Sequence, residues 1–341
     1  MKAMVLSHTG KLADNPHPLA LVDLPVPVPG DRDVLIKVSV CGVCHTELDE
    51  IEGRTPPPSL PVIPGHQVIG HIAAVGKQVT AFSLEDRVGV AWIFSACGEC
   101  RFCLAGDENL CPEFCATGRD ANGGYAEYMT APSQFVYPIP QAFSDVQAAP
   151  LLCAGAIGYR SLRLTGIKNG ERLGLTGFGA SGHLVLKMAR YKFPQSKIYV
   201  FARSVEERRF ALQLGAVWAG ESGQAIPHKL DAIIDTTPVW GPIVHALANL
   251  EAGGRLVINA IRKEDDKQNL LELDYSEHLW REKEIKSVAN ITRRDVTEFL
   301  ELAAAMRLKP EIQLYPLEEA NQALIELKTG RIRGAKVLQI S

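Results

Sequence analysis

Four closely spaced cysteines have the spacing of a structural metal site. They follow the pattern C-x2-C-x2-C-x7-C and are Cys97, Cys100, Cys103 and Cys111. Four thiolates on one short lobe make a closed tetrahedral zinc site, which has no open coordination position and therefore supports structure. Two alternatives remain: an iron–sulfur cluster, because closely spaced cysteines also bind iron, and free surface thiols.

Two cysteines and a histidine from three separate segments could form another metal site. The segments are "CGVCHTELDE", which starts at Cys41, "PGHQVIG" with His66, and "LLCAGAIGY" with Cys153. Such a set leaves one position of a zinc ion open for water or substrate, as in catalytic zinc sites. Taken singly, each residue has a plainer explanation, since a buried cysteine is commonly a small hydrophobic residue. Within the first segment, Cys44 and His45 are neighbours and cannot both easily point at one ion.

A glycine-rich turn predicts a binding site for a dinucleotide. The sequence "GLTGFGASGHLVLKMA" contains G-x-G-x-x-G at Gly177, Gly179 and Gly182, with Ala180 and Ser181 inside the motif. The motif follows a predicted strand and opens a predicted helix, which is the context that it requires. Its glycines let the backbone approach a pyrophosphate at the N-terminus of the helix. The alternative is a glycine turn without a ligand.

The end of the next predicted strand indicates which cofactor is preferred. An NAD enzyme carries an aspartate or glutamate there, about twenty residues after the glycine motif, for the ribose hydroxyls. This chain has "VFARSVEERR", which places Arg203, Ser204 and Arg208 in that region. Because no carboxylate repels it, a 2′-phosphate could bind Arg203 and the Ser204 hydroxyl. The sequence therefore predicts NADP(H) in preference to NAD(H). The alternative is that the arginines begin a solvated helix and that the cofactor is NAD.

The predicted elements change character near residue 150. Before it, short β-branched runs such as "DVLIKVSV" and "QVIGHIAAVG" alternate with proline and glycine, which predicts a mostly antiparallel β domain. From "RLGLTGFG" onward strands and helices alternate, which favours a parallel, doubly wound sheet. Between the two parts, "DVQAAPLLCAGAIGYRSLRLTG" has a helical pattern.

Composition excludes several classes of protein. The 341 residues carry a net charge of −3, and the charged side chains are scattered, so no nucleic-acid footprint is evident. The start, "MKAMVLSHTG", lacks the apolar core of a signal peptide, and no apolar run is long enough to span a bilayer. We therefore expect a cytoplasmic protein, in whose reducing surroundings clustered thiols more often bind metal than form disulfides.

The motifs occur in an order that is typical of a known family. "CGVCHTEL", "PGH", the four-cysteine lobe, "LLCAGAIGYRSL" and "GFGASGH" follow one another, and over essentially its whole length the chain resembles the zinc-dependent medium-chain alcohol dehydrogenases, particularly the bacterial ones. The resemblance implies an α/β fold with a GroES-like catalytic domain at residues 1–150, completed by residues 290–341, and a Rossmann cofactor-binding domain at residues 151–289. It also implies about two zinc ions per chain and a homodimer or homotetramer joined through Rossmann sheet edges.

The same resemblance implies a reaction. A hydride would pass between the nicotinamide cofactor and a small or medium alcohol, aldehyde or ketone. One alternative is a reductase of aryl or cinnamyl-type aldehydes. The other is a cofactor-binding protein without turnover, which serves a structural or sensing role.

The resemblance also assigns residues of the catalytic centre. Cys44 rather than Cys41 is the zinc ligand beside His66 and Cys153. Thr46 matches the residue that bonds the substrate oxygen and begins a proton relay, although a threonine there could also simply cap a helix.

Three nearby residues differ from the usual family pattern. Asp49 stands where a histidine often finishes the relay, so its carboxylate could accept the proton, or the relay could end in water. Glu47 stands where an aspartate usually supports the ligand histidine. Gln67 stands where glutamate is common, and its neutral amide cannot take over a role that needs a carboxylate.

The remaining assignments concern cofactor and substrate. His45 matches a position that contacts the pyrophosphate, with an exposed histidine as the alternative. Trp92 matches a position that lines the substrate pocket, with a core tryptophan as the alternative. Near the C-terminus, Ala335 occupies the place of an arginine that can bind the pyrophosphate, which leaves Arg333 or Lys336 to serve.

Overall fold

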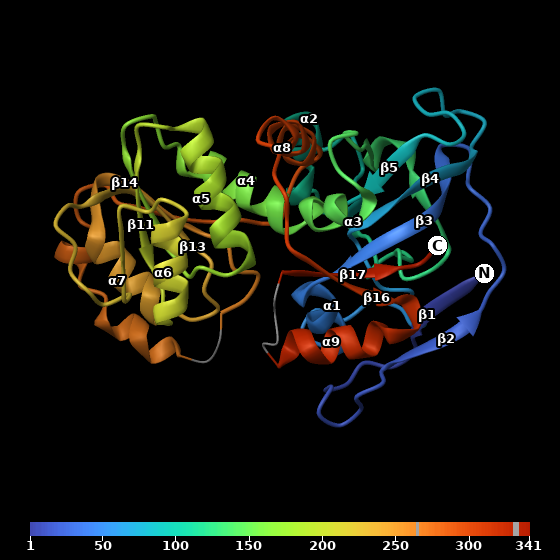
Figure 1. Cartoon of the computed structure of the whole chain (residues 1–341), viewed down its shortest axis with the longest axis horizontal. Coiled ribbons are helices and arrows are strands. Elements are labelled where there is room, and N and C mark those ends of the chain that lie inside the picture. Colours follow the sequence, from blue (N-terminus) through green and yellow to red (C-terminus); the bar gives the residue numbers. More distant parts are fainter. Residues whose placement is uncertain (264–265, 330–333) are drawn as a thin grey trace. The chain divides into compact units, whose positions relative to one another are not determined.

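The computed structural model describes residues 1–263, 266–329 and 334–341, which form two units (Figure 1). The first unit comprises Met1–Cys153 and Ile291–Ser341, and the second comprises Ala154–Asn290. The chain therefore leaves the first unit, builds the second and returns to the first.

The first unit contains a seven-stranded sheet whose strands follow the order β16-β17-β3-β4-β5-β9, with β8 paired to β3. Its pairs are antiparallel except for β16 with β17. The strands are β3 (Asp33–Val43), β4 (Val68–Val75), β5 (Arg87–Val90), β8 (Tyr128–Pro132), β9 (Val136–Pro138), β16 (Ile312–Pro316) and β17 (Ala335–Gln339). Their β-branched side chains suit a pleated, half-buried surface, and the predicted antiparallel β domain is confirmed.

Smaller elements surround this sheet. A two-stranded sheet pairs β1 (Lys2–Leu6) with β2 (Leu19–Asp23). The short helix α1 (His45–Ile51) follows β3 directly, and two C-terminal helices pack in the same unit, α8 (Arg293–Ala305) and α9 (Ala320–Lys328). The four-cysteine segment forms a lobe with little regular structure: β6 (Ile93–Ser95), α2 (Arg101–Leu104), η1 (Glu108–Leu110) and β7 (Cys115–Ala116).

The helical pattern before the second unit is interrupted in the structure. It consists of α3 (Asp145–Ala148), the 3₁₀ turn η3 (Ala149–Leu152) and α4 (Ala154–Thr165). Pro150 lies in the first turn of η3, and Cys153 has φ −123° and ψ −81°, outside the helical range. The break places Cys153 at the end of a turn of the first unit instead of on the face of a continuous helix.

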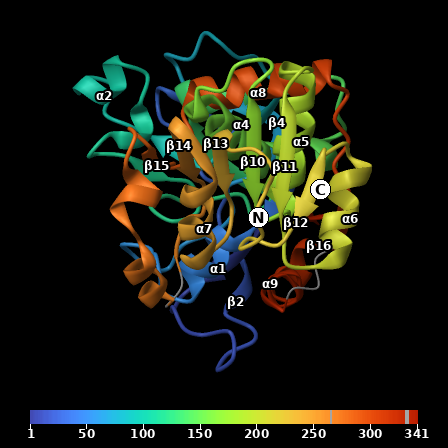
Figure 2. The same ribbon diagram turned by 90° about the vertical axis from the view of Figure 1, so that its left-hand side faces the viewer.

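The second unit contains a six-stranded sheet in which all pairs are parallel. The strand order is β12-β11-β10-β13-β14-β15, which is the Rossmann order, and Figure 2 shows most of these strands side by side. The strands are β10 (Arg172–Thr176), β11 (Lys197–Phe201), β12 (Trp218–Gly220), β13 (Leu230–Asp235), β14 (Leu250–Ile258) and β15 (Glu284–Ser287). The connecting helices include α5 (Ala180–Lys192), α6 (Val205–Gln213) and α7 (Gly241–Asn249). The predicted parallel sheet is confirmed.

Each unit has a core of its own. In the first unit, side chains of β1, β3, β4 and α9 form one buried apolar cluster, and in the second unit those of β11, β13, β14 and α7 form another. Helices in the described ranges are all too short or too polar to cross a membrane.

Candidate active site

Cys44 is fixed by the start of helix α1. It is the N-cap residue, and its Sγ accepts a hydrogen bond from the backbone N–H of Thr46 at 3.4 Å. The backbone N–H of Cys44 donates in turn to Oε2 of Glu47 at 2.8 Å. This reciprocal capping box starts the helix immediately after β3 and fixes the direction of the Cys44 side chain.

Cys44, His66 and Cys153 converge in the first unit. Their ligand atoms all lie within 4.8 Å of one another, and Sγ of Cys44 is 3.6 Å from Nε2 of His66. A tetrahedral zinc ion bound to one sulfur and one nitrogen separates these atoms by about 3.6 Å. Cys41 is not part of this group. Its side chain is buried and packs closely on Gly65, so that a Cβ atom added to that glycine would lie 2.9 Å from the Cys41 Sγ. The donor set therefore fits one zinc ion.

The electrostatics of Cys44 also favour a bound cation. The pKa of its thiol is raised well above the usual value, first by a hydrogen bond with Cys153 and then by burial and by the negative charges of Cys153 and Glu47. A thiolate is therefore costly there unless a positive charge compensates it, and a metal ion supplies that charge.

Glu47 orients His66. Oε1 of Glu47 lies 2.5 Å from Nδ1 of His66, and both side chains are buried. Burial opposes the charge on the carboxylate, but His66 and the backbone N–H of Cys44 outweigh it and lower the pKa of Glu47. With Nδ1 facing the Glu47 carboxylate, Nε2 is the nitrogen that faces Cys44.

The other predicted residues near this centre have different surroundings. Thr46 is buried, and its hydroxyl makes no hydrogen bond within the part of the chain that the structure describes. The Asp49 carboxylate is buried and paired with Arg54, whose Nε donates to Oδ1 at 2.6 Å. The Gln67 side chain is buried and packs closely on Gly42. A Cβ atom added to that glycine would lie 2.6 Å from Oε1 of Gln67. His45 is the exposed first residue of α1.

Trp92 belongs to an aromatic cluster that sequence reasoning missed. Its ring stacks on Phe114 with centroids 4.7 Å apart, and the Arg119 guanidinium lies 5.8 Å from the Trp92 ring and 5.7 Å from the Phe114 ring. Arg119 also donates to Asp120, with Nη2 2.7 Å from Oδ2. The only sequence signal was the closeness of Phe114 to the last cysteine of the lobe, which does not reveal the stacking.

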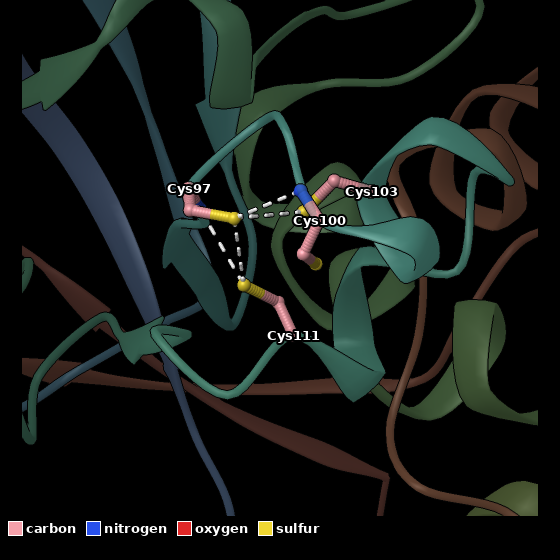
Figure 3. Close-up of side chains that lie close together, drawn as sticks. All are labelled: Cys97, Cys100, Cys103 and Cys111. Carbon is pink, nitrogen blue, oxygen red and sulfur yellow. Dashed lines mark hydrogen bonds between the residues drawn. The ribbon is translucent and has the colours of Figure 1, made fainter.

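The four cysteines of the lobe face a common space (Figure 3). Sγ of Cys97 lies 3.5 Å from Sγ of Cys111 and 3.9 Å from Sγ of Cys103. Four thiolates around one tetrahedral zinc ion stand about 3.8 Å apart. Because a multinuclear iron–sulfur cluster separates its thiolates further, these distances favour a single ion.

The cysteine lobe is joined to helix α8. Glu108, which is buried in η1, accepts hydrogen bonds from both the backbone N–H of Arg293, at 2.8 Å, and its Nε, at 2.9 Å. Arg293 is the first residue of α8, so the lobe and the returning C-terminal segment are connected within the first unit.

The glycine turn of the second unit fits a pyrophosphate. Gly177 has φ +81°, which favours glycine, and a Cβ on Gly182 would stand 2.8 Å from the carbonyl oxygen of Gly177. A Cβ added to Gly179, by contrast, would meet no described atom within 4 Å apart from its own residue and its two chain neighbours. The first turn of α5 thus packs tightly on the glycine turn, which stays open at Gly179 and leads into the motif residues Ala180 and Ser181 at the start of the helix.

The end of β11 carries the predicted basic residues. Ser204 is the N-cap of α6 and accepts from the N–H of Glu207 at 3.0 Å, while Arg203 is exposed. Nη1 of Arg208 donates to the carbonyl oxygens of Ala202 and Arg203, both at 2.9 Å. Arg208 is therefore held next to the strand end instead of extending into solvent.

Of the two C-terminal candidates for pyrophosphate binding, the structure describes one. Arg333 lies outside the described residues. Lys336 is buried, and its Nζ donates to Gln313 at 3.0 Å, to the Tyr315 hydroxyl at 2.5 Å and to Glu326 at 2.8 Å. These bonds use all three donors of the ammonium group, which disfavours the alternative in which Lys336 serves the pyrophosphate.

Comparison with known proteins extends these findings. Residues 30–141 match the family model of the alcohol dehydrogenase GroES-like domain, and residues 214–338 match that of the zinc-binding dehydrogenases. The chain is 43% identical to a protein of Mycobacterium tuberculosis called "Probable alcohol dehydrogenase AdhA", over 95% of this chain and 93% of that protein. It is 33% identical to an alcohol dehydrogenase of Geobacillus stearothermophilus, over 100% and 99% of the two chains.

A solved structure confirms the fold. The crystal structure of an NAD-dependent alcohol dehydrogenase matches with a TM-score of 0.88 and 25% identity, and the match covers 100% of both chains. The predicted combination of a GroES-like domain with a Rossmann domain is therefore confirmed. The chain belongs to the zinc-type medium-chain alcohol dehydrogenases and is an oxidoreductase of that family.

Proposed function

We propose that this chain transfers a hydride between NADP(H), used in preference to NAD(H), and a small or medium alcohol, aldehyde or ketone. The observation that carries the proposal is the convergence of Cys44, His66 and Cys153 from three separate segments to within 4.8 Å. A three-residue set with an open fourth position is the pattern of a catalytic zinc site, whereas the four-cysteine lobe would hold a structural ion.

Zinc and cofactor supply the chemistry that side chains lack. Held by Cys44, His66 and Cys153, a zinc ion would supply a Lewis acid that favours ionisation of an alcohol, and a bound nicotinamide would supply the hydride acceptor. The chain's own contribution begins with Glu47, whose contact with Nδ1 directs Nε2 of His66 to the site and increases its basicity as a ligand. In our proposal Glu47 thus orients the ligand histidine, a role that an aspartate usually has.

We assign the transfer of the alcohol proton to the Thr46 hydroxyl. The backbone N–H of Thr46 donates to Sγ of Cys44, the side chain is buried, and its hydroxyl is not engaged by another described residue, which supports its assignment to the substrate oxygen. Arg54 already occupies Oδ1 of Asp49. We therefore place the end of the relay in water and assign Asp49 a supporting role in fixing α1, although the sequence alone had left its carboxylate as a possible acceptor.

The preference for NADP(H) rests on the end of β11. Arg203 and the Ser204 hydroxyl follow the strand where a carboxylate would select NAD, and Arg208 adds positive charge close to them. Glu221 lies 3.3 Å from Nη1 of Arg208 and offsets part of that charge. We also propose that His45 contacts the pyrophosphate, since it is exposed at the start of α1.

One combined measurement tests the proposal. Metal analysis should find about two zinc ions per chain, and a panel of alcohols, aldehydes and ketones should show turnover that is faster with NADPH than with NADH at equal concentration. A strong NADH preference would overturn the cofactor assignment alone. Turnover confined to aryl or cinnamyl-type aldehydes would support that alternative, with Trp92 and Phe114 as the residues to vary. Absence of hydride transfer with every substrate would support a binding protein without turnover.

A further inference from the structure

A buried ion pair lies at the carboxyl edge of the parallel sheet of the second unit. Asp235 is the last residue of β13, and its Oδ2 is 2.6 Å from Nζ of Lys263, which follows β14. The side chain of Asp235 is 0% exposed and that of Lys263 10% exposed. The strand order reverses between β10 and β13, and ligands of open α/β sheets bind outside the carboxyl ends of strands at this point.

Lys263 is bonded to the segment that follows β13. Besides Asp235, its Nζ donates to the carbonyl oxygens of Thr237, at 2.8 Å, and Val239, at 3.2 Å. The other carboxylate oxygen of Asp235 accepts from the Thr237 hydroxyl at 2.8 Å. These bonds use all three donors of Lys263, so the ammonium group holds residues 236–240 in place and has none left for a ligand.

The segment 236–240 packs on the glycine turn. A Cβ on Gly177 would stand 2.6 Å from Oγ1 of Thr236 and 3.1 Å from Cγ2 of Thr237. The N–H and hydroxyl of Thr236 both donate to the carbonyl oxygen of Thr176, at 2.8 and 3.0 Å, and Thr176 directly precedes Gly177. Any shift of the segment therefore changes the surroundings of the turn.

We propose that Asp235 and Lys263 are positioning residues that set the affinity for the pyrophosphate and nicotinamide part of the cofactor. The inference rests on the proposed function. The adenosine part is expected at the end of β11, on one side of β10, whereas β13 adjoins β10 on the other side. The ion pair therefore acts on the part of the cofactor that lies beyond the glycine turn.

A variant of Lys263 tests whether the ion pair affects binding of one part of the cofactor and not of the other. In Lys263→Met, calorimetric dissociation constants for NADPH and NADH should rise by about tenfold, because an unpaired buried carboxylate no longer holds the segment. The adenosine probes 5′-AMP and 2′,5′-ADP should bind within about twofold of their wild-type affinity. Lys283→Met is the matched control, because Nζ of Lys283 also donates to two backbone carbonyls, those of Leu247 and Glu277, but Lys283 precedes β15 at the opposite edge of the sheet. Its affinities should not change.

Other results would overturn the inference. If Lys263→Met lowers the melting temperature but binds both dinucleotides as the wild type does, the pair serves stability alone. If dinucleotides and adenosine probes weaken equally, the effect is not confined to one part of the cofactor. Should Lys263→Met fail to fold, Lys263→Gln keeps an amide donor for the carbonyls and is judged by the same constants. Absence of dinucleotide binding by the wild-type protein would instead refute the proposed function.

Discussion

At the scale of single residues, the first prediction follows from the contact between Glu47 and His66. Glu47→Gln keeps the size of the side chain but removes the charge 2.5 Å from Nδ1 of His66. We expect zinc at the catalytic site to bind about 10- to 100-fold more weakly. Dialysis against a graded series of chelator concentrations, followed by metal analysis, should show that one of two zinc ions leaves early.

Glu50→Gln is the control for that experiment. Glu50 lies one helical turn further along α1, and burial, followed by the charge of Glu47, raises its pKa to about 9. Because a protonated carboxyl at neutral pH resembles an amide, this variant should retain both ions. Equal zinc loss from the two variants would mean that any change of buried charge in α1 weakens the site, and that Glu47 has no special role.

A second residue prediction concerns Thr46. Thr46→Val preserves shape but removes the hydroxyl that we assign to the substrate oxygen. We expect kcat to fall by about 100-fold or more, with an unchanged zinc content and an unchanged dissociation constant for the cofactor. Thr46→Ser restores the hydroxyl and should restore most of the rate. Full activity of the valine variant would remove Thr46 from the mechanism.

The motifs predicted which cysteines and histidine come together, but not the pairing of charged side chains. The cysteine lobe is visible in the sequence because its four ligands lie within fifteen residues. Lys336, in contrast, lies in a short strand and is bonded to side chains of β16 and α9. The partners of a buried charge depend on how strands and helices pack against one another. Motifs and periodicity in a single sequence do not predict that packing.

At the scale of elements, helix α1 is connected to its neighbours through Glu52. Its carboxylate accepts from the N–H of Leu12 at 3.0 Å, from Nη1 of Arg54 at 2.7 Å and from Lys328 at the end of α9. Burial works against the charge, but these bonds outweigh it and lower the pKa of Glu52 to about 2. The carboxylate therefore stabilises the folded chain above its unfolded pKa of about 4.5, and this contribution is lost as the pH falls towards 2.

Glu52→Gln should consequently be less stable than the wild type at pH 7, by about 1–2 kcal/mol after solvent screening. The difference should shrink as the pH is lowered from 5 towards 2. Urea unfolding at several pH values measures it. Glu318→Gln is the control, since Glu318 makes an exposed 3.8 Å pair with Lys2, and its replacement should change stability little at any pH. A difference for Glu52→Gln that does not depend on pH would contradict this account.

Element types could also be predicted better than element boundaries. The alternation of strands and helices after residue 170 predicted the parallel sheet because each strand is a short apolar run. The helical pattern around Cys153 was misleading, because apolar periodicity continues through residues whose backbone leaves the helix. Pro150 was the local signal for this break, but a proline is also tolerated in the first turn of a helix.

At the scale of the whole molecule, the last prediction concerns the edge strand β15. Within the described residues it pairs only with β14, and all four of its residues are exposed. Exposed apolar side chains occur in it and just before it, with Ile285 45% and Trp280 57% exposed. A strand with one unpaired edge beside apolar surface favours pairing with another chain, so we expect two copies to join their β15 strands.

Light scattering after size exclusion should then give a multiple of 37.2 kDa. Ile285→Lys places a charge on the edge strand and should shift the mass towards the monomer. Leu84→Lys is a matched control, because Leu84 is 61% exposed in the first unit and lies between β4 and β5, outside any strand, and the variant should keep the wild-type mass. A monomeric wild-type protein at micromolar concentration would refute the assembly. An unchanged mass for Ile285→Lys would show instead that copies associate through another surface.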